Sequence, residues 1–498
     1  MEREETQSVV FPLSADGRRS TSALGRAVVA DALRPVDAAG ALGAEQETNW
    51  RSGYLVHFRR LVEAGLASKA AAQSIARDGV GSLHARMRVS GPDGEETELD
   101  ALLSAPAQAS VATVTVPGAA QPEAELSLPY RGERLRGGPL AQRLDAWVSG
   151  GIIEPSCADA VKEVAAHPEW LRLPGRTVAA LGAGAEVGPV EVLLRWGAQV
   201  AAVDLPSPPA WERLLGMARR GAGTLLVPVT GAAPSLSPPG NGDEDTARRA
   251  GLDLAQQVPA AADWLAGLDG PLVLGNYVYA DGAANVAVCA AADALTARLQ
   301  AARGDLALAF LATPTDVYAV PADAVAHSAR AYASRSRAAK LAGRPLRTLS
   351  GGRLLRRAYV PGVDPGICDS LVSQQGPNYA LAKRLQRWRA TVAREAGATV
   401  SLNIAPPTRT RSVVKNRALA AAYAGAHRFG AEVFEPATTR TLMAALLVHD
   451  LHAAGLAHAH PWQDEAYAAA HGGLWRIAYA PRSALGLAAL LGYGAARP

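Results

Sequence analysis

Apolar residues recur in two alternating kinds of run over the C-terminal two thirds of this 498-residue chain. Short apolar runs, typical of strands buried on both faces of a sheet, alternate with longer stretches that have helical spacing. We predict strands at Thr177–Leu181, Gln199–Val203, Thr224–Val229, Pro271–Leu274, Leu306–Leu311 and Thr399–Ile404. The predicted helices between them are Pro189–Trp196, Thr246–Leu268, Ala284–Gln300 and Tyr379–Glu395. This alternation predicts an α/β fold with a doubly wound parallel sheet.

The first 170 residues show a different pattern. A helix is predicted at Leu55–Ala76, and period-two alternation at Leu83–Val89 before a Pro92-Asp-Gly turn predicts a hairpin. A further β-like run and two further helices are expected at Ser110–Val116, Gln142–Val148 and Cys157–Ala166. We therefore predict a mixed α+β region over residues 1–170, to which the sequence assigns no chemistry. A second domain is expected over residues 171–498, with insertions at about 230–245 and 322–375.

A glycine-rich turn directly follows the first strand of the second domain. It reads Gly182-Ala-Gly184-Ala-Glu-Val-Gly188 and precedes a predicted helix. Gly182 allows the tight turn, Gly184 allows a pyrophosphate to approach the backbone, and Gly188 allows the helix to pack close to the sheet. The helix N-terminus offers free N–H groups to phosphates. This arrangement predicts a Rossmann-type dinucleotide site, although the third glycine comes one residue later than in the usual fingerprint.

The second predicted strand ends at Asp204, about 20 residues beyond the glycine turn, where a carboxylate can hold both ribose hydroxyls. No basic residue directly follows Asp204, and its charge would repel a 2′-phosphate. NAD is therefore the favoured cofactor and NADP the alternative. The same layout also serves S-adenosylmethionine in methyltransferases.

A tyrosine and a lysine lie one helical turn apart at Tyr379 and Lys383. A neighbouring ammonium and a positive nicotinamide both favour the phenolate, so we expect a lowered pKa for Tyr379. Such a phenol can exchange a proton with a carbonyl or hydroxyl as hydride moves.

With this pair, residues from about 176 to 410 resemble the short-chain dehydrogenase/reductase family. The resemblance rests on the glycine turn with the following "LLRWGAQVAAVDL", on Tyr379-x-x-x-Lys383, and on "GATVSLNIAPPTRT" at the sixth strand. It implies hydride transfer with Tyr379 and Lys383 as the proton-transfer pair. It also implies that Lys383 holds the cofactor ribose.

The resemblance implies further site residues. Thr313 or Thr315, after the fifth strand, would hold the substrate carbonyl, and Asn285 would complete a proton relay. Asn276 would take part of the family's Asn-Asn-Ala-Gly motif. A nicotinamide loop would include Asn403, Pro406 and Thr408 or Thr410.

The chain departs from the family pattern at the substrate-binding residue. The family's serine lies about a dozen residues before the tyrosine, whereas Thr313 and Thr315 lie more than 60 residues before Tyr379. Ser370 and Ser373 are closer but end no visible strand. Pro407 stands where a glycine is usual.

A basic segment runs from Ala324 to Val363 without a single Asp or Glu. Its nine cations are Arg330, Arg335, Arg337, Lys340, Arg344, Arg347, Arg353, Arg356 and Arg357. Such a run attracts anions, so a phosphorylated substrate, coenzyme A or an acidic acyl carrier protein would suit it. The alternative is a solvated face, or an intersubunit surface that pairs with acids such as Asp243–Asp245.

Composition narrows the class of protein. Charged residues make up 19% and hydrophobic residues 49%, which excludes a wholly disordered chain. A net charge of +4 gives no reason to expect nucleic-acid binding, and no apolar stretch predicts a membrane span. The acidic N-terminus and three distant cysteines favour a cytoplasmic protein, which we expect to form a homo-oligomer. The histidines at 449, 452, 458 and 460 have no flanking ligand pattern, and no metal is predicted.

The leading functional hypothesis is therefore an NAD(P)-dependent oxidoreductase of the carbonyl reductase or alcohol dehydrogenase type. A methyltransferase would use the glycine turn and Asp204 but give Tyr379 and Lys383 no role. A non-catalytic Rossmann binding protein is the third reading, because the spacing from the threonines to Tyr379 departs from the family pattern.

Overall fold

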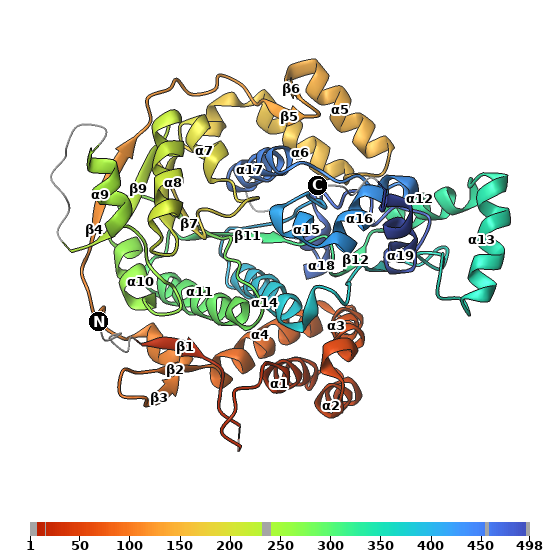
Figure 1. Ribbon diagram of the computed structural model, residues 1–498, viewed down its shortest axis with the longest axis horizontal. Helices are drawn as coiled ribbons and strands as arrows, with labels where there is room; N and C mark the ends of the chain where they lie inside the picture. Colours follow the sequence, from red (N-terminus) through yellow and green to blue (C-terminus); the bar gives the residue numbers. More distant parts are fainter. Residues whose placement is uncertain (1–6, 15, 232–240, 454–457, 495–498) are drawn as a thin grey trace.

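A seven-stranded sheet forms the centre of the computed structural model, which describes residues 7–494 except 15, 232–240 and 454–457 (Figure 1). The strands lie in the order β14-β11-β10-β7-β8-β9-β4. Six are parallel, and β4 at one edge is antiparallel to β9. Their bounds are β4 (Val111–Pro117), β7 (Thr177–Leu181), β8 (Gln199–Val203), β9 (Thr224–Thr230), β10 (Leu272–Asn276), β11 (Ala307–Ala312) and β14 (Val400–Ile404). The chain is thus an α/β protein whose sheet is mixed and mostly parallel, not wholly parallel.

Helices cover both faces of the sheet, which explains the continuous apolar strands. Val178 and Ala180 point into one hydrophobic core, while Ala179 and Leu181 point into the other. One face carries α10 (Val258–Ala266), α11 (Ala283–Ala302) and α14 (Gly376–Glu395), with an outer layer of α1 (Thr21–Leu33), α2 (Ala38–Gln46), α3 (Trp50–Gly65) and α4 (Lys69–Arg86). The opposite core includes α5 (Gly137–Ser149), α6 (Pro155–Ala166), α7 (Val190–Trp196), α8 (Pro208–Arg220), α9 (Asn241–Arg249) and α17 (Pro436–His452).

All six predicted strands of the second domain are confirmed, and β7 and β8 match at both ends. The helix predicted at Thr246–Leu268 is wrong as a single element, because it divides into α9 and α10. Between them Ala250 forms a β-bridge with Val229, and Gly251 has φ +112°. A Cβ at Gly251 would come 2.7 Å from the Cα of Pro206. The close approach of the two backbones therefore interrupts the helix.

The N-terminal predictions also need correction. The stretch Leu55–Ala76 belongs to two helices, since Ser68 accepts a hydrogen bond from the N–H of Ala71 and caps the start of α4. The alternation at Leu83–Val89 is mostly the end of α4, and only β2 (Arg88–Ser90) is extended. β2 pairs with β3 (Glu96–Glu98), which confirms the hairpin, and with β1 (Ser8–Val10).

Elements from the first 170 residues pack directly against the rest of the chain. β4 completes the sheet, and α4 packs on α14, where a Cβ at Gly79 would come 2.5 Å from the Trp388 ring. A further ribbon is formed by β5 (Leu128–Tyr130) and β6 (Glu133–Leu135). The predicted division near residue 170 stays a prediction.

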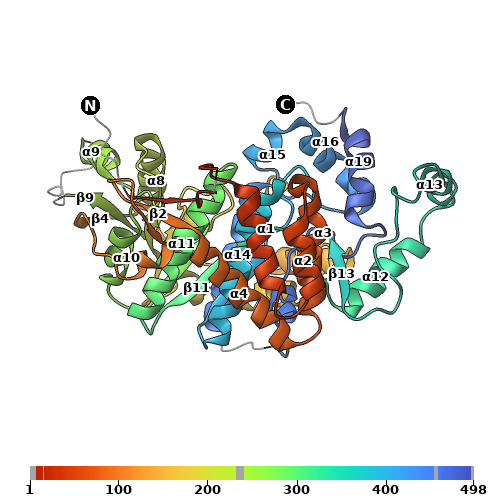
Figure 2. The same cartoon turned by 90° about the horizontal axis from the view of Figure 1, so that it is seen from below.

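The remaining elements lie on the side of the molecule away from β4, toward the right of Figures 1 and 2. They are β12 (Val317–Val320), β13 (Gly366–Asp369), α12 (Ala322–Ala333), α13 (Arg337–Leu349), α15 (Arg411–Lys415), α16 (Arg417–Gly425), α18 (Pro461–Ala466) and α19 (Pro481–Gly492). Helix α13, inside the predicted insertion 322–375, protrudes from the body in both views. Of the predicted insertion 230–245, residues 232–240 lie outside the described residues. Among the described helices, none is both long and apolar enough to cross a membrane.

Candidate active site

The glycine turn closes tightly at its first residue. Gly182 has φ +77°, and its N–H donates to the carbonyl of Val203 at 2.8 Å. A Cβ at Gly182 would come 2.9 Å from the carbonyl oxygen of Tyr277, in the loop after β10. Glycine is therefore required here, both by the positive φ and by the approach of a neighbouring strand end.

The last part of the turn differs from expectation. Helix α7 begins only at Val190, after Pro189, so the turn is longer than that of the usual fingerprint. A Cβ at Gly188 would meet the Ala185 carbonyl at 3.3 Å. The tight contact at Gly188 thus lies within the turn itself, and its predicted role in helix–sheet packing stays a prediction.

Asp204 holds the turn in place from the end of β8. Its Oδ2 accepts the N–H of Gly184 at 2.6 Å, and its Oδ1 accepts the N–H of Leu205 at 2.8 Å. Each carboxylate oxygen has a second lone pair beyond these bonds. Asp204 is therefore fixed beside the glycine turn and can accept further hydrogen bonds.

Two asparagines organise the loop that follows β10. Asn276 Oδ1 accepts hydrogen bonds from the N–H of Val278 at 3.4 Å and from Gln386 Nε2 at 3.2 Å. Asn285, in the first turn of α11, accepts the N–H of Ala280 at 3.0 Å. Both side chains are buried. These contacts assign both asparagines a loop-positioning role; the relay predicted for Asn285 stays a prediction.

Tyr379 and Thr313 meet at the carboxyl end of β11. The Thr313 hydroxyl lies near the Tyr379 phenol, and the Tyr279 ring packs edge-on against Tyr379 with centroids 6.2 Å apart. Burial raises the pKa of Tyr379, and the neighbouring Thr313 hydroxyl lowers it only in part. The expected lowering of this pKa is wrong for the chain without cofactor, because desolvation disfavours the phenolate.

Lys383 points to the same strand end. Its Nζ donates to the carbonyl of Leu311 at 3.1 Å and to Gln386 Oε1 at 3.0 Å. Burial lowers the pKa of Lys383. Its ammonium is thus held by the Leu311 carbonyl of β11 and by Gln386 of α14 itself.

The insertion before Tyr379 is a ribbon whose two ends meet. β12 and β13 pair antiparallel, and on return Ser370 donates its N–H to Asp316 O at 3.2 Å and its hydroxyl to Pro314 O at 2.7 Å. Thr315 accepts a hydrogen bond from Gln375 at 2.6 Å and lies 2.9 Å from the Thr313 hydroxyl. The ribbon therefore brings the threonines beside α14 despite the long gap in sequence.

Ser370 and Ser373 differ in position. The buried hydroxyl of Ser370 is committed to the carbonyls of Pro314 and Asp316. Ser373 is exposed, and its hydroxyl contacts Gln374. Of the hydroxyl residues considered, Thr313 is the one that contacts Tyr379.

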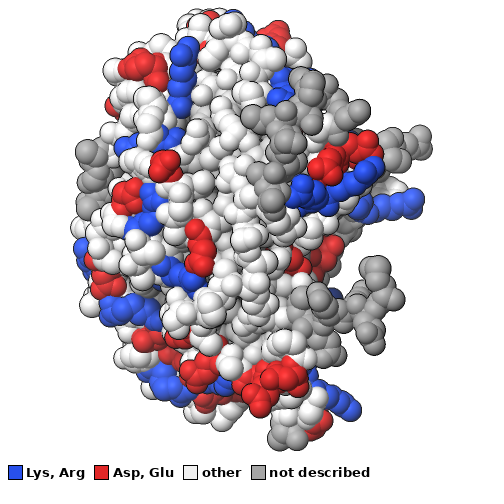
Figure 3. All heavy atoms as spheres, turned by 90° about the vertical axis from the view of Figure 1, so that its left-hand side faces the viewer, with Lys and Arg blue, Asp and Glu red and all other residues white. Residues whose placement is uncertain are grey.

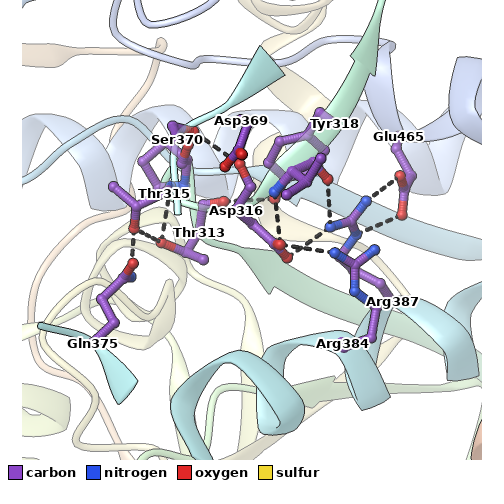
Figure 4. A network of polar contacts seen from close by, with 12 residues as sticks. Thr313, Thr315, Asp316, Tyr318, Asp369, Ser370, Gln375, Arg384, Arg387 and Glu465 are labelled. Carbon is purple, nitrogen blue, oxygen red and sulfur yellow. Dashed lines mark hydrogen bonds and ion pairs between the residues drawn. The ribbon is translucent and has the colours of Figure 1, made fainter. Parts of the chain in front are cut away.

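A buried ion network, which the sequence reasoning missed, supports this strand end (Figure 4). Asp316 accepts from Arg384 at 2.8 Å and from Arg387 at 2.6 Å, and Arg387 also binds Glu465 through two nitrogens. Burial alone would raise the pKa of Asp316, but the two arginines more than offset it and the pKa is lowered. The arginines at 384 and 387 gave no signal of burial in the sequence, because charged residues in a helix ordinarily indicate a solvated face.

The segment after β14 lies against the glycine turn. The Arg411 N–H donates to Glu186 Oε2 at 3.0 Å, which links α15 to the turn. The buried hydroxyl of Thr408 is bonded to Pro406 O and to Thr439 of α17, and Asn403 is bonded to Ser401 and Asp450. Thr408 and Asn403 thus have structural partners here, while Thr410 is paired with Ser412 near the surface.

The four late histidines lie in separate settings. His449 contacts Glu163 and Asp450, His458 contacts Asp464, and His460 caps α18. His452 stacks on Trp170. Among the residues that the structure describes, no group of three or more His, Cys, Asp or Glu side chains could hold a metal ion.

The six parallel strands thus define an α/β protein. A polar cluster lies at the carboxyl end of β11, and a glycine turn held by Asp204 lies at the carboxyl end of β7. Comparisons with protein-family models, with curated proteins and with solved structures found no match to this chain.

Proposed function

We propose that this chain is an NAD(P)-dependent oxidoreductase with a Rossmann-type sheet, in which Tyr379 exchanges the proton and Thr313 orients the substrate oxygen. The observation that carries the proposal is that Thr313, Tyr379 and Lys383 all lie at the carboxyl end of β11. A methyltransferase or a binding protein would leave this cluster without a role.

The sheet topology supports a dinucleotide site. Counted along the chain and read from β9 to β14, the parallel strands lie in the order 3-2-1-4-5-6, the order of doubly wound dinucleotide-binding sheets. The order reverses between β7 and β10, whose carboxyl ends carry Gly182 and Asn276. Ligands of such sheets bind in the crevice at this reversal.

The residues present fit a dinucleotide. Asp204 lies beside the glycine turn with acceptor lone pairs to spare for ribose hydroxyls, and its charge favours NAD over NADP. Lys383 and Asn276, linked through Gln386, lie at the ends of the adjacent strands β11 and β10. When bound there, the cofactor supplies or accepts the hydride.

The protein's own residues perform the proton chemistry. In the reduction direction a substrate carbonyl accepts a hydrogen bond from Tyr379, which its raised pKa keeps protonated at neutral pH. Thr313 holds the same oxygen or the phenol, and Thr315 with Gln375 fixes the position of Thr313. Lys383 then stabilises the phenolate left after proton transfer.

Thermal unfolding with added ligands tests the proposal. We expect NAD to raise Tm, NADP to raise it less, and S-adenosylmethionine to leave it unchanged, because binding to the folded state alone stabilises it by mass action. Stabilisation by S-adenosylmethionine alone would favour the methyltransferase. No shift with any of the three would favour the binding-protein reading.

A further inference from the structure

The basic segment Ala324–Val363 carries nine cations, and none of them forms an ion pair with any residue that the structure describes. The acids considered as their partners are already paired elsewhere: Asp243 with Arg219, Glu244 with Arg248 and Asp245 with Arg249. Figure 3 shows acidic and basic side chains interspersed on the face that carries β4 and α9. The excess positive charge is therefore confined to the basic segment and is not found on the face that carries β4 and α9.

Part of this charge surrounds a cavity of about 380 Å³. The cavity is lined by Gly351, Gly352, Arg353, Arg356, Arg482 and Ser483. It lies between the end of α13 and the beginning of α19, so it is built by two segments far apart in the sequence. We call it the arginine cavity.

Main-chain hydrogen bonds fix the two walls of the arginine cavity. The N–H of Leu355 donates to Ser483 O at 3.2 Å, and the N–H of Ala480 donates to Arg356 O at 2.9 Å. The N–H of Arg356 also donates to the buried hydroxyl of Ser483 at 3.0 Å. Arg356 is therefore held beside the first turn of α19 by its backbone, and Arg353 lies three residues before it in the same wall.

The electrostatics of the arginine cavity are unbalanced. Helix α19 has no side-chain cap and no acidic residue in its first turn, so its positive end is uncompensated. The carboxylate of Asp369 accepts two hydrogen bonds from Arg482, at 2.6 and 2.7 Å, and balances that arginine. The positive charges of Arg353 and Arg356 and of the helix end are left without a balancing carboxylate in the cavity. Together they favour the binding of an anion with more than one negative charge.

We propose that the arginine cavity binds a phosphate group. Guanidinium groups bind phosphate oxygens with paired, charge-assisted hydrogen bonds, and a helix N-terminus adds main-chain donors. The phosphate can belong to a soluble molecule or to a phospholipid. The second source is relevant because Leu341 and Leu349 on the protruding α13 are 72% and 86% exposed. This proposal does not depend on the proposed reductase function.

Calorimetric titration of the full chain with inorganic phosphate, at constant ionic strength, tests the cavity. The variant Arg353→Gln/Arg356→Gln keeps the Arg482–Asp369 pair and should weaken binding at least about tenfold, equivalent to about 1.4 kcal/mol. The control variant Arg330→Gln/Arg337→Gln removes the same charge from the basic segment outside the cavity and should change affinity less than about twofold. Equal weakening by both variants, or no binding by the wild type, would overturn the soluble source.

Vesicles of phosphatidylcholine with and without phosphatidylglycerol distinguish the two sources. If the phosphate is a lipid headgroup, Leu341→Ser/Leu349→Ser should reduce binding to the anionic vesicles but leave inorganic phosphate binding unchanged. If it belongs to a soluble molecule, no vesicle binding should depend on Arg353 and Arg356. The proposal fails when neither phosphate nor vesicle binding distinguishes the cavity variant from its control.

Discussion

The main-chain N–H of Gly184 donates a 2.6 Å hydrogen bond to Oδ2 of Asp204, across 20 residues of chain and from one strand end to the next. The carboxylate therefore has two separable functions. It holds the glycine turn as an acceptor, and it places a negative charge where a 2′-phosphate would lie in the proposed site.

Substitutions at Asp204 separate these functions. Asp204→Asn keeps an acceptor for Gly184 but removes the charge, so we expect relative affinity to shift toward NADP. Asp204→Ala removes both and should weaken NAD binding by about tenfold or more. Titration with NAD and NADP measures both effects. Tighter NADP than NAD binding by the wild type would contradict the assignment.

Tyr379→Phe keeps the ring against Tyr279 and removes the proton that the proposed reaction needs. We expect kcat to fall by about 10²–10⁴ with cofactor affinity unchanged. Tyr279→Phe is the matched control, since that hydroxyl contacts Asp281, and it should lower kcat less than about threefold. A Tyr379→Phe enzyme with wild-type kcat would remove Tyr379 from the mechanism.

Asp316→Asn leaves the buried Arg384 without its carboxylate and Arg387 with Glu465 alone. Loss of one partner in a buried network costs about 3–5 kcal/mol. We therefore expect the free energy of unfolding, measured by urea denaturation, to decrease by that amount. Asp145→Asn is the surface control, because the Lys162–Asp145 pair is exposed and should contribute only about 0–1 kcal/mol. Equal effects of the two substitutions would mean that the Asp316 network does not stabilise the fold.

His84 links the N-terminal helices to the core through Asp293 at 2.7 Å and Asp100 at 2.6 Å. Burial lowers the pKa of His84, but the hydrogen bonds and charges of the two aspartates more than offset it, so the pKa is raised. The stabilisation is complete below the unfolded-state pKa of about 6.5 and is lost as the pH rises through the raised folded-state value.

Wild-type stability should therefore decline relative to His84→Gln as the pH rises from about 6.5, measured as the difference in unfolding free energy between the two proteins. A difference that is constant or grows with pH would show that folding does not raise the pKa of His84. His452→Gln is the control, because the His452 ring stacks on Trp170 and lies 2.8 Å from the carbonyl oxygen of Val448.

Local pattern was sufficient for the strands and for the positions of Gly182 and Asp204, which belong to the proposed cofactor site. After their first residues, Thr177 and Gln199, β7 and β8 are apolar throughout because both faces are covered, so their ends could be read from the sequence. Gly182 and Asp204 follow directly from those ends. Glycine at 182 is required by the backbone, a constraint that leaves a visible mark in the sequence.

The arrangement of the proposed catalytic residues, Thr313 and Tyr379, depends on the tertiary structure. Tyr379 lies near Thr313 because the β12–β13 ribbon returns the chain to Asp316 through hydrogen bonds at Ser370. The pairing of β12 with β13 joins segments far apart in the chain, so it leaves no periodic pattern of apolar residues in the sequence. The buried network of Asp316, Arg384 and Arg387 was hidden for the same reason, since charged residues in a helix indicate a solvated face until their partners are known. Periodicity records which face of an element is buried, whereas the partners of buried charges and the closure of an insertion depend on contacts between distant segments.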